Sequence, residues 1–166
     1  LVHPENRGKG AAVRTGFSAS KGELILLCDA DLATPIAELD RLAPAATGGM
    51  VIGSRAVDRS RIEQAQPWYR DLMGRTFNLA VRLLAVSGIH DTQCGFKLVD
   101  GGLGRRLAAV QQIDGFAFDV ELMYLARRWG RSVVEVPVRW SHVEASRVRP
   151  GRHSLEMLGD LIRLRW

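Results

Sequence analysis

Residues Leu24–Pro35 read L-I-L-L-C-D-A-D-L-A-T-P, and this stretch decides the fold class. Its four apolar residues and cysteine form a short run typical of a buried strand. Thr34 and Pro35 then suit the N-cap and the first position of a helix. Asp29 and Asp31 therefore lie where a buried strand ends, which is where α/β sheets bind their ligands.

Two carboxylates one residue apart repel each other unless a cation or hydrogen-bond donors stabilise them. A hard divalent cation beside Asp29 and Asp31 would do so, and it would carry the phosphates of a nucleotide. Helix capping and solvation at a strand end explain the same residues nearly as well. The stretch thus predicts a candidate sugar-nucleotide site, with capping as the alternative.

The composition fits one globular domain of 166 residues and 18.3 kDa. The net charge of +5 and the pI near 9.9 favour anionic partners, but the arginines are scattered, which argues against nucleic acid. Cys28 and Cys94 form no C-x-x-C pair, so a reduced compartment is expected. No apolar run approaches the roughly 20 residues of a membrane-spanning helix. The opening Leu1–Pro4 resembles the tail of a strand, and we expect a fragment whose N-terminus lies upstream.

Helical and strand patterns alternate along the chain, which predicts an α/β fold. Asp58–Gln66 is polar and is expected to be a mobile loop. The expected helices are 11–20, 35–42, 67–86, 102–109, 120–129 and 154–164. The expected strands are 24–28, 50–53, 95–99 and 133–140.

Basic residues stand in two places where they suit a phosphate. Asn6–Gly10 reads N-R-G-K-G, and with Arg14 it would place cations, Lys9 among them, beside a diphosphate that the glycines let approach. An ordinary turn is the alternative. Arg55 ends a strand and suits bidentate phosphate contact, with a solvated surface arginine as its alternative.

Two other segments are dense in polar chemistry. Asp91–Lys97 reads D-T-Q-C-G-F-K just before a short strand, and such loops are often functional; its Cys94 is best explained as a small buried hydrophobe. Asp119 and Glu121 open a helix, where the helix dipole stabilises negative charge. A general base is the alternative for either carboxylate. The histidines show no metal-ligand spacing.

These motifs in their order resemble family-2 glycosyltransferases, and within them the dolichyl-phosphate β-glucosyltransferases and their polyprenyl-phosphate relatives. The resemblance covers essentially the whole chain. It is carried by N-R-G-K-G-x-A-V-R-x-G from Asn6, D-A-D-L-A-T from Asp29, G-S-R from Gly53, D-T-Q-C-G-F-K-L from Asp91, F-D-V-E-L from Phe118, E-V-P-V-R-W from Glu135, and the closing S-R-V-R-P with M-x-x-D-L-I-R-L-R-W.

The resemblance implies a GT-A fold, a Rossmann-like sheet with flanking helices, and residues 1–166 would be about the C-terminal two-thirds of that domain. Asp31 would hold Mg²⁺ or Mn²⁺ on the donor diphosphate, with Asp29 as its donor-side companion and second metal ligand. Ala33 stands where some relatives have a metal-binding Gln.

The remaining roles also come from the resemblance. Arg55 and Arg70 would bind the acceptor phosphate, and Arg147 replaces a usual Lys near the donor diphosphate. The donor-binding set is completed by Lys9, Arg14 and Gln93. Asp119 and Glu121 rank lower, as groups that order the site or act as base.

The activity that the resemblance implies is inverting transfer of glucose from UDP-glucose to a dolichyl or polyprenyl phosphate. We expect a peripheral protein on the cytoplasmic face of a membrane, with no nucleic-acid partner. The sequence leaves the oligomeric state open. Another sugar, such as mannose from GDP-mannose, another acceptor, or a non-catalytic anion- or membrane-binding module remains an alternative. Without the N-terminal donor-binding part, the chain by itself is expected to be inactive.

Overall fold

A mixed sheet with strand order β1–β4–β2–β5 forms the centre of the molecule in the computed structural model, which describes residues 1–143, 157, 159 and 160. A small parallel sheet pairs β3 with β6 beside it. The strands are β1 Leu24–Cys28, β2 Met50–Ser54, β3 Ile62–Gln64, β4 Phe96–Asp100, β5 Val133–Pro137 and β6 Trp140–Ser141. The α/β prediction is therefore confirmed.

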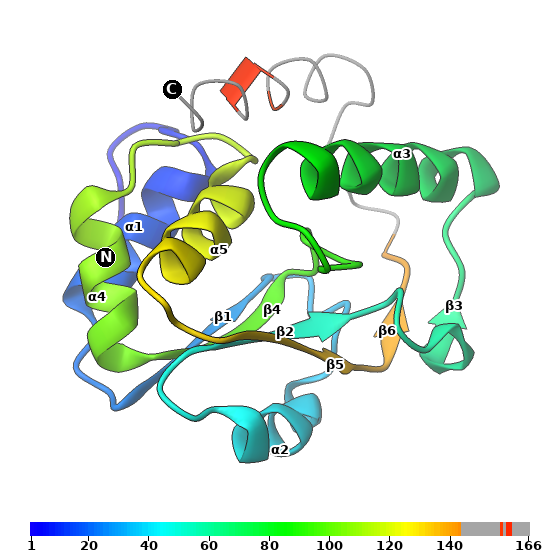
Figure 1. Cartoon of the computed structure of the whole chain (residues 1–166), viewed down its shortest axis with the longest axis horizontal. Coiled ribbons are helices and arrows are strands. Elements are labelled where there is room, and N and C mark those ends of the chain that lie inside the picture. The colour runs from blue at the N-terminus through cyan, green and yellow to red at the C-terminus, as the bar shows by residue number, and fades with distance from the viewer. Residues whose placement is uncertain (144–156, 158, 161–166) are drawn as a thin grey trace.

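Helices cover both faces of the central sheet. Figure 1 shows α1, α4 and α5 gathered on one side, α2 on the opposite face, and α3 lying apart from them. The α-helices are α1 Lys9–Ala19, α2 Leu39–Leu42, α3 Trp68–Leu84, α4 Gly101–Val110 and α5 Phe118–Arg128. Short 3₁₀ turns are η1 Ile36–Glu38, η2 Ala43–Ala45 and η3 Arg59–Arg61.

The strand directions bring separate motifs to one edge of the sheet. β4 runs antiparallel to both β1 and β2, with Leu98 opposite Leu26 on one side and Val51 on the other. β5 runs parallel to β2, with Glu135 opposite Ile52. The carboxyl ends of β1, β2 and β5 therefore share the edge at which β4 begins.

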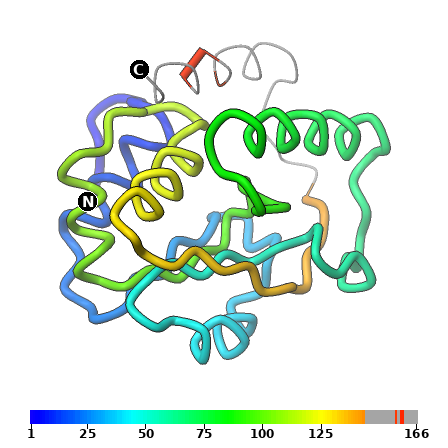
Figure 2. Tube along the Cα trace, in the orientation of Figure 1, coloured from blue at the N-terminus to red at the C-terminus, as the bar shows by residue number. Residues whose placement is uncertain are grey.

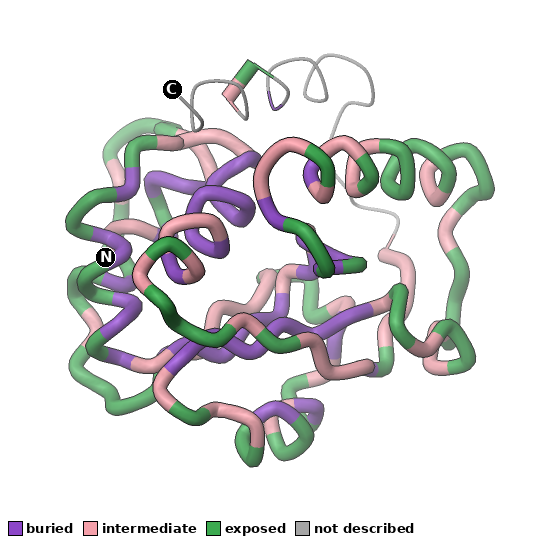
Figure 3. Tube along the Cα trace, in the orientation of Figure 1, coloured by how far each residue is buried: buried purple, intermediate pink, exposed green. Residues whose placement is uncertain are grey.

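The core lies between the central sheet and the α1, α4 and α5 group. β2 is buried along its whole length, and Phe96, Phe118 and Leu122 are fully buried; Figure 3 shows this burial as purple in β2, β4 and the inner side of α5. Each such side chain contributes about 1.5–3 kcal/mol by leaving water. The Asp100 side chain caps α4 by accepting the Leu103 N–H at 2.8 Å.

α3 packs differently from the other long helices. Val81 is its only buried residue, whereas Trp68, Leu72, Leu79 and Leu83 are 77%, 56%, 54% and 75% exposed. Its apolar spacing does predict the helix, but most of that face is not core. In Figure 2 the chain returns from the end of α3 down to the sheet through residues 85–95. None of the helices in the described part of the chain is long and apolar enough to cross a bilayer.

The structure corrects three local predictions. The strand expected at 133–140 is divided into β5 and β6, which belong to different sheets. The helix expected from Pro35 begins as η1 at Ile36 and has no side-chain cap, so Thr34 is not its N-cap. Asp31 instead accepts a hydrogen bond in the turn before it, from the Ala33 N–H to Oδ1 at 3.1 Å. The loop expected at 58–66 is ordered into η3 and β3, whose pairing with β6 is a long-range contact. The helix expected at 154–164 lies outside the described residues apart from 157, 159 and 160.

Candidate active site

A cavity of about 280 Å³ opens at the shared edge of the sheet. Asp29 follows β1, Arg55 follows β2 and Gly95 precedes β4, so three separate parts of the chain line it. Most of the side chains selected from the sequence are there: Lys9, Asp29, Asp31, Arg55, Arg70, Gln93 and Asp119. The tertiary structure thus collects motifs as far apart in the sequence as Lys9 and Asp119.

The acidic side of this cavity contains its own cation. Asp29 Oδ1 lies 2.7 Å from Lys9 Nζ, while Asp31 is exposed. Burial opposes the charge on Lys9, but the carboxylates of Asp119 and Asp29 outweigh it and raise the pKa of the lysine. Lys9 therefore stays charged at neutral pH and partly neutralises the acidic pair.

Asp29 and Asp31 offer the hard oxygen ligands that Mg²⁺ and Mn²⁺ prefer. Within the described ranges, no cluster of three or more His, Cys, Asp or Glu side chains is placed to hold a metal. Mg²⁺ commonly binds through one or two carboxylates together with substrate phosphates. The donor set therefore fits a cation that a diphosphate also ligates.

Gly95 fixes the place of the Asp29 carboxylate. The Asp29 N–H donates to the Gly95 carbonyl at 2.8 Å, which ties the end of β1 to the start of β4. A Cβ on residue 95 would lie 1.9 Å from Asp29 Oδ2, so only glycine leaves room for the carboxylate. The glycine of the D-T-Q-C-G-F-K motif is thus part of the acidic site.

Arg55 lines the same cavity and is held rigidly. Its Nε and Nη2 donate to the two oxygens of Asp91 at 2.7 and 2.8 Å, and its Cζ lies 5.3 Å from the centre of the Trp140 ring. Burial would raise the pKa of Asp91, but the charge and hydrogen bonds of Arg55 lower it. Arg55 is therefore oriented by an ionised carboxylate, and Arg70 lines the same cavity from α3.

Asp119 reaches the cavity with a buried lysine behind it. Lys97 Nζ lies 2.6 Å from Asp119 Oδ1 and donates to the Cys94 carbonyl at 2.5 Å, and the lysine is 0% exposed. Burial raises the pKa of Asp119, although Lys97 and Lys9 oppose this. A carboxylate in this position can accept hydrogen bonds from the hydroxyls of a ligand.

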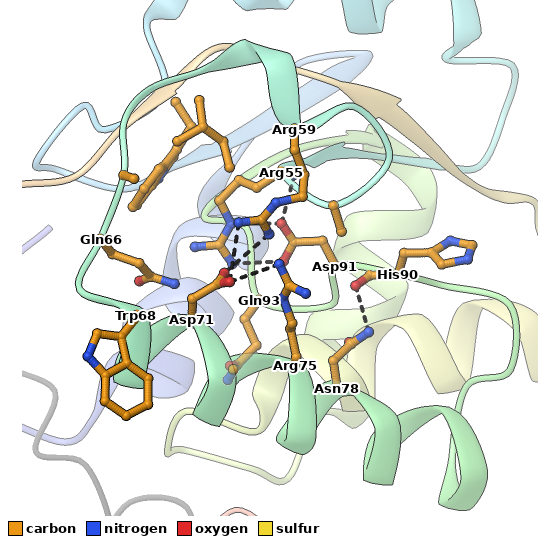
Figure 4. A pocket seen from close by; sticks show the side chains of 15 residues that line it. Arg55, Arg59, Gln66, Trp68, Asp71, Arg75, Asn78, His90, Asp91 and Gln93 are labelled. Atoms are coloured by element: carbon orange, nitrogen blue, oxygen red, sulfur yellow. Dashed lines mark hydrogen bonds and ion pairs between the residues drawn. The ribbon is translucent and has the colours of Figure 1, made fainter.

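A second cavity of about 290 Å³ shares Arg55 with the first and extends under α3. Figure 4 shows the guanidinium groups of Arg55, Arg59 and Arg75 gathered around the carboxylates of Asp71 and Asp91. Asp71 pairs with Arg59 at 3.2 Å and with Arg75 at 2.9 Å. Arg55 thus stands between a cavity with an acidic pair and one lined by arginines.

Residues 1–99, more than half of the chain, match the family described as "Glycosyl transferase family 2". The chain belongs to glycosyl transferase family 2. This confirms the family that the ordered motifs resemble, and the match includes the acidic pair, Arg55 and the whole Asp91–Lys97 motif.

Curated family-2 relatives with similar sequences are named dolichyl-phosphate beta-glucosyltransferase. The protein of Dictyostelium discoideum is 36% identical over 98% of this chain and 52% of its own length. The Drosophila melanogaster protein is 38% identical over 95% of this chain and 51% of its own length. The Homo sapiens protein is 37% identical over 98% of this chain and 53% of its own length. The chain therefore spans about half the length of these relatives.

Solved structures of glucosyl-3-phosphoglycerate synthase from Mycobacterium tuberculosis share the fold. The complex with uridine diphosphate aligns with a TM-score of 0.61 at 20% identity, covering 99% of this chain and 56% of that one. The complex with Mn²⁺, UDP-glucose and glycerol 3-phosphate aligns with a TM-score of 0.62 at 21% identity, and it covers the same shares of the two chains. At this identity the likeness shows the fold, and the GT-A prediction is confirmed.

The structure brings neither Glu121 nor Arg14 into the lining of the two cavities. The Glu121 carboxylate accepts the N–H groups of Gln112 and Ile113 at 2.8 and 2.9 Å, which makes it an anchor for the loop before α5. Arg14 pairs with Asp114 at 2.7 Å. Both polar groups are therefore occupied by the protein itself.

Arg147, expected near the donor diphosphate, lies outside the described residues.

The glycines of N-R-G-K-G also have a different use in this family-2 chain. A Cβ on Gly8 would lie 2.2 Å from the Asp114 carbonyl oxygen, and one on Gly10 2.3 Å from that of Ile113. The Gly10 N–H donates to Asp114 at 2.8 Å. The glycines thus admit the 113–115 loop, and Lys9 is the residue of this motif that lines the cavity.

Sequence reasoning did not select Asp91, Lys97 or Trp140 as site residues. One signal was available for Lys97, because a lysine inside the apolar run F-K-L-V of a predicted strand must find a buried partner. Asp91 opens the polar segment Asp91–Lys97, but nothing local marks its carboxylate as the partner of Arg55, and no local signal marks Trp140. Their roles arise from contacts with Arg55, which is far away in the sequence.

Proposed function

We propose that the protein transfers glucose from UDP-glucose to a dolichyl or polyprenyl phosphate, with inversion at the sugar carbon and with Mg²⁺ or Mn²⁺ bound. The observation that carries this proposal is one cavity in which Asp29, Asp31 and Lys9 lie together with Arg55 and Arg70. Such a cavity offers oxygen ligands for a metal diphosphate and guanidinium groups for a second phosphate. The names of the curated relatives and the UDP-glucose complex of the solved neighbour support this choice of substrates.

The donor binds on the acidic side in this proposal. Asp31 would hold the cation with Asp29 as its companion, and Lys9 and Gln93 would contact the donor. The bound cation would neutralise the charge that develops on the departing UDP. Lys9 adds a fixed positive charge within the same cavity, which stabilises that charge without reorganisation.

The acceptor binds at the arginines. A phosphate is already anionic at neutral pH, so it needs little help from a general base. Arg55, fixed by Asp91, and Arg70 orient the acceptor oxygen for in-line attack on the sugar carbon. Asp119 then serves to order the sugar hydroxyls. Glu121, whose carboxylate is already occupied, is left out of this mechanism.

We further propose that the protein works as a peripheral protein at the cytoplasmic face of a membrane, where its lipid acceptor resides. The exposed apolar side chains of α3, with Trp68 and Leu83 at 77% and 75% exposure, support this. Tryptophan and leucine on one side of a helix suit the headgroup region of a bilayer. α3 also contributes residues to the lining of both cavities, each of which includes Arg55, so a lipid bound along α3 would carry its phosphate next to Arg55.

A labelling assay tests the proposal directly. Labelled UDP-glucose is incubated with the full-length protein, dolichyl phosphate and Mn²⁺, and GDP-mannose is offered in parallel to test the sugar. Asp31→Asn and Arg55→Lys should each lower kcat/KM about 100-fold or more. Asp40→Asn and Arg128→Lys, both on exposed helical positions, serve as matched controls. Failure to form labelled lipid, or a preference for mannose, would refute the proposed reaction.

A further inference from the structure

Glu135 lies in the middle of β5 and takes part in none of the roles assigned above. Its side chain is only 7% exposed. Oε1 accepts the Ser54 hydroxyl and the Asp91 N–H, both at 2.8 Å. Oε2 accepts the His90 N–H at 2.8 Å and lies 3.0 Å from His90 Nδ1. One buried carboxylate thus joins the end of β2 to the loop between α3 and β4.

That loop carries the carboxylate that orients Arg55. Asp91 is held at its backbone by Glu135, and its side chain accepts from Nε, Nη2 and the backbone N–H of Arg55 at 2.7, 2.8 and 2.9 Å. Arg55 also lines both cavities, and Figure 4 shows its guanidinium beside Asp91 in one of them. A shift of the loop would therefore be transmitted to Arg55 through a short, nearly buried chain of hydrogen bonds.

We propose that Glu135 is a positioning residue that acts through Asp91 on Arg55 and thereby sets the affinity for the acceptor phosphate. The inference rests on the proposed function in one respect, the assignment of Arg55 to that phosphate. Glu135 touches no substrate in this arrangement. Its effect is to keep Asp91 in register with the guanidinium, so that Arg55 presents a fixed edge to the phosphate before it binds.

Glu135→Gln is the sharpest perturbation, because it keeps the shape of the side chain. A carboxylate can accept from all four donors, whereas an amide replaces one acceptor oxygen by an NH₂ group. Either orientation of the amide sets that NH₂ against a backbone N–H, of Asp91 or of His90. The loop must then move, and Arg55 loses its fixed partner. Glu23→Gln, at an exposed position before β1, is the matched control.

The test is a double-mutant cycle with Arg55→Ala in the full-length protein, read as KM for dolichyl phosphate, kcat, and Kd for UDP with Mn²⁺. Glu135→Gln should raise the acceptor KM about 10-fold and leave the UDP Kd within about twofold. In the Arg55→Ala background, the same change should add less than about twofold, because its target is gone. Ser54→Ala removes one donor to Glu135 and should raise the acceptor KM about two- to threefold, which provides a measurement if Glu135→Gln does not fold.

The outcomes separate the two hypotheses. If Arg55→Ala leaves the acceptor KM unchanged, the assignment of Arg55 to the acceptor phosphate is wrong and the proposed function must be revised. If Arg55→Ala raises it but Glu135→Gln and Ser54→Ala do not, the positioning role is refuted and the proposed function stands. A third outcome is that Glu135→Gln raises the acceptor KM by the same factor with and without Arg55, or weakens UDP binding by the same factor as it raises the acceptor KM. Either result would show a general structural role and overturn the inference.

Discussion

Gly95→Ala should disable the acidic site while leaving the fold intact. The new Cβ would lie 1.9 Å from Asp29 Oδ2, and ordinary van der Waals contact begins at 3.4 Å, so the carboxylate must move by about 1.5 Å. The contact is with the end of a side chain that is 34% exposed, so it can rotate away from the Cβ. Overpacking typically lowers the free energy of unfolding by about 1–3 kcal/mol, and we expect a loss near the lower end of that range.

The functional cost should be much larger than the cost in stability. Displacing Asp29 breaks its ion pair with Lys9 and moves one of the two candidate metal ligands. Misplacement of a site by about 1 Å can reduce a rate about 100-fold. Calorimetric titration of UDP with and without Mn²⁺ should accordingly show metal-dependent affinity weakened about 10- to 100-fold in Gly95→Ala.

Gly16→Ala is the matched control for this experiment. Gly16 lies inside α1, and a Cβ there meets nothing within 4 Å. Alanine should stabilise that helix by up to about 1 kcal/mol and leave UDP binding unchanged. A folded Gly95→Ala protein with wild-type, Mn²⁺-dependent affinity for UDP would refute the reasoning about Asp29.

Three further predictions concern other parts of the chain. Asp91→Asn should lower the free energy of unfolding by about 3 kcal/mol at pH 7, because Arg55 loses its ionised partner. Since Arg55 lowers the pKa of Asp91, that stabilisation is present above the unfolded pKa of about 4 and is lost as the pH falls through the folded pKa. Urea titrations at pH 7 and pH 3 should therefore show a smaller difference at pH 3, and equal differences would contradict this. Burial raises the pKa of Cys94 to about 11, so iodoacetamide at pH 8 should modify this thiol only in urea; rapid modification of Cys94 in the native protein, located by peptide mapping because Cys28 is also free, would disprove the burial argument. Leu79→Glu combined with Leu83→Glu should weaken binding to phospholipid vesicles about 10-fold without changing Tm, because both side chains are exposed; unaltered vesicle binding would exclude α3 as the membrane contact.

Much of the fold follows from local patterns. The apolar run at Leu24–Cys28 is β1 with the predicted bounds, and Asp100 caps α4 through a local hydrogen bond. The local pattern is less informative where tertiary contacts decide. Residues 62–64 became a strand only because β6 lies beside them, and the apolar spacing of α3 does not reveal that much of that face is exposed.

By itself the sequence determined the helices and the strands of the central sheet, the family and the place of Asp29 and Asp31 at a strand end, because each depends on neighbours in the chain. The tertiary structure decided which of the candidate polar groups work together. It joined Lys9 to Asp29, Asp91 to Arg55 and Lys97 to Asp119, and it engaged Glu121 with backbone amides instead. These outcomes depend on which charges become neighbours when separate segments pack, and a buried charge is stable only where packing supplies its partner.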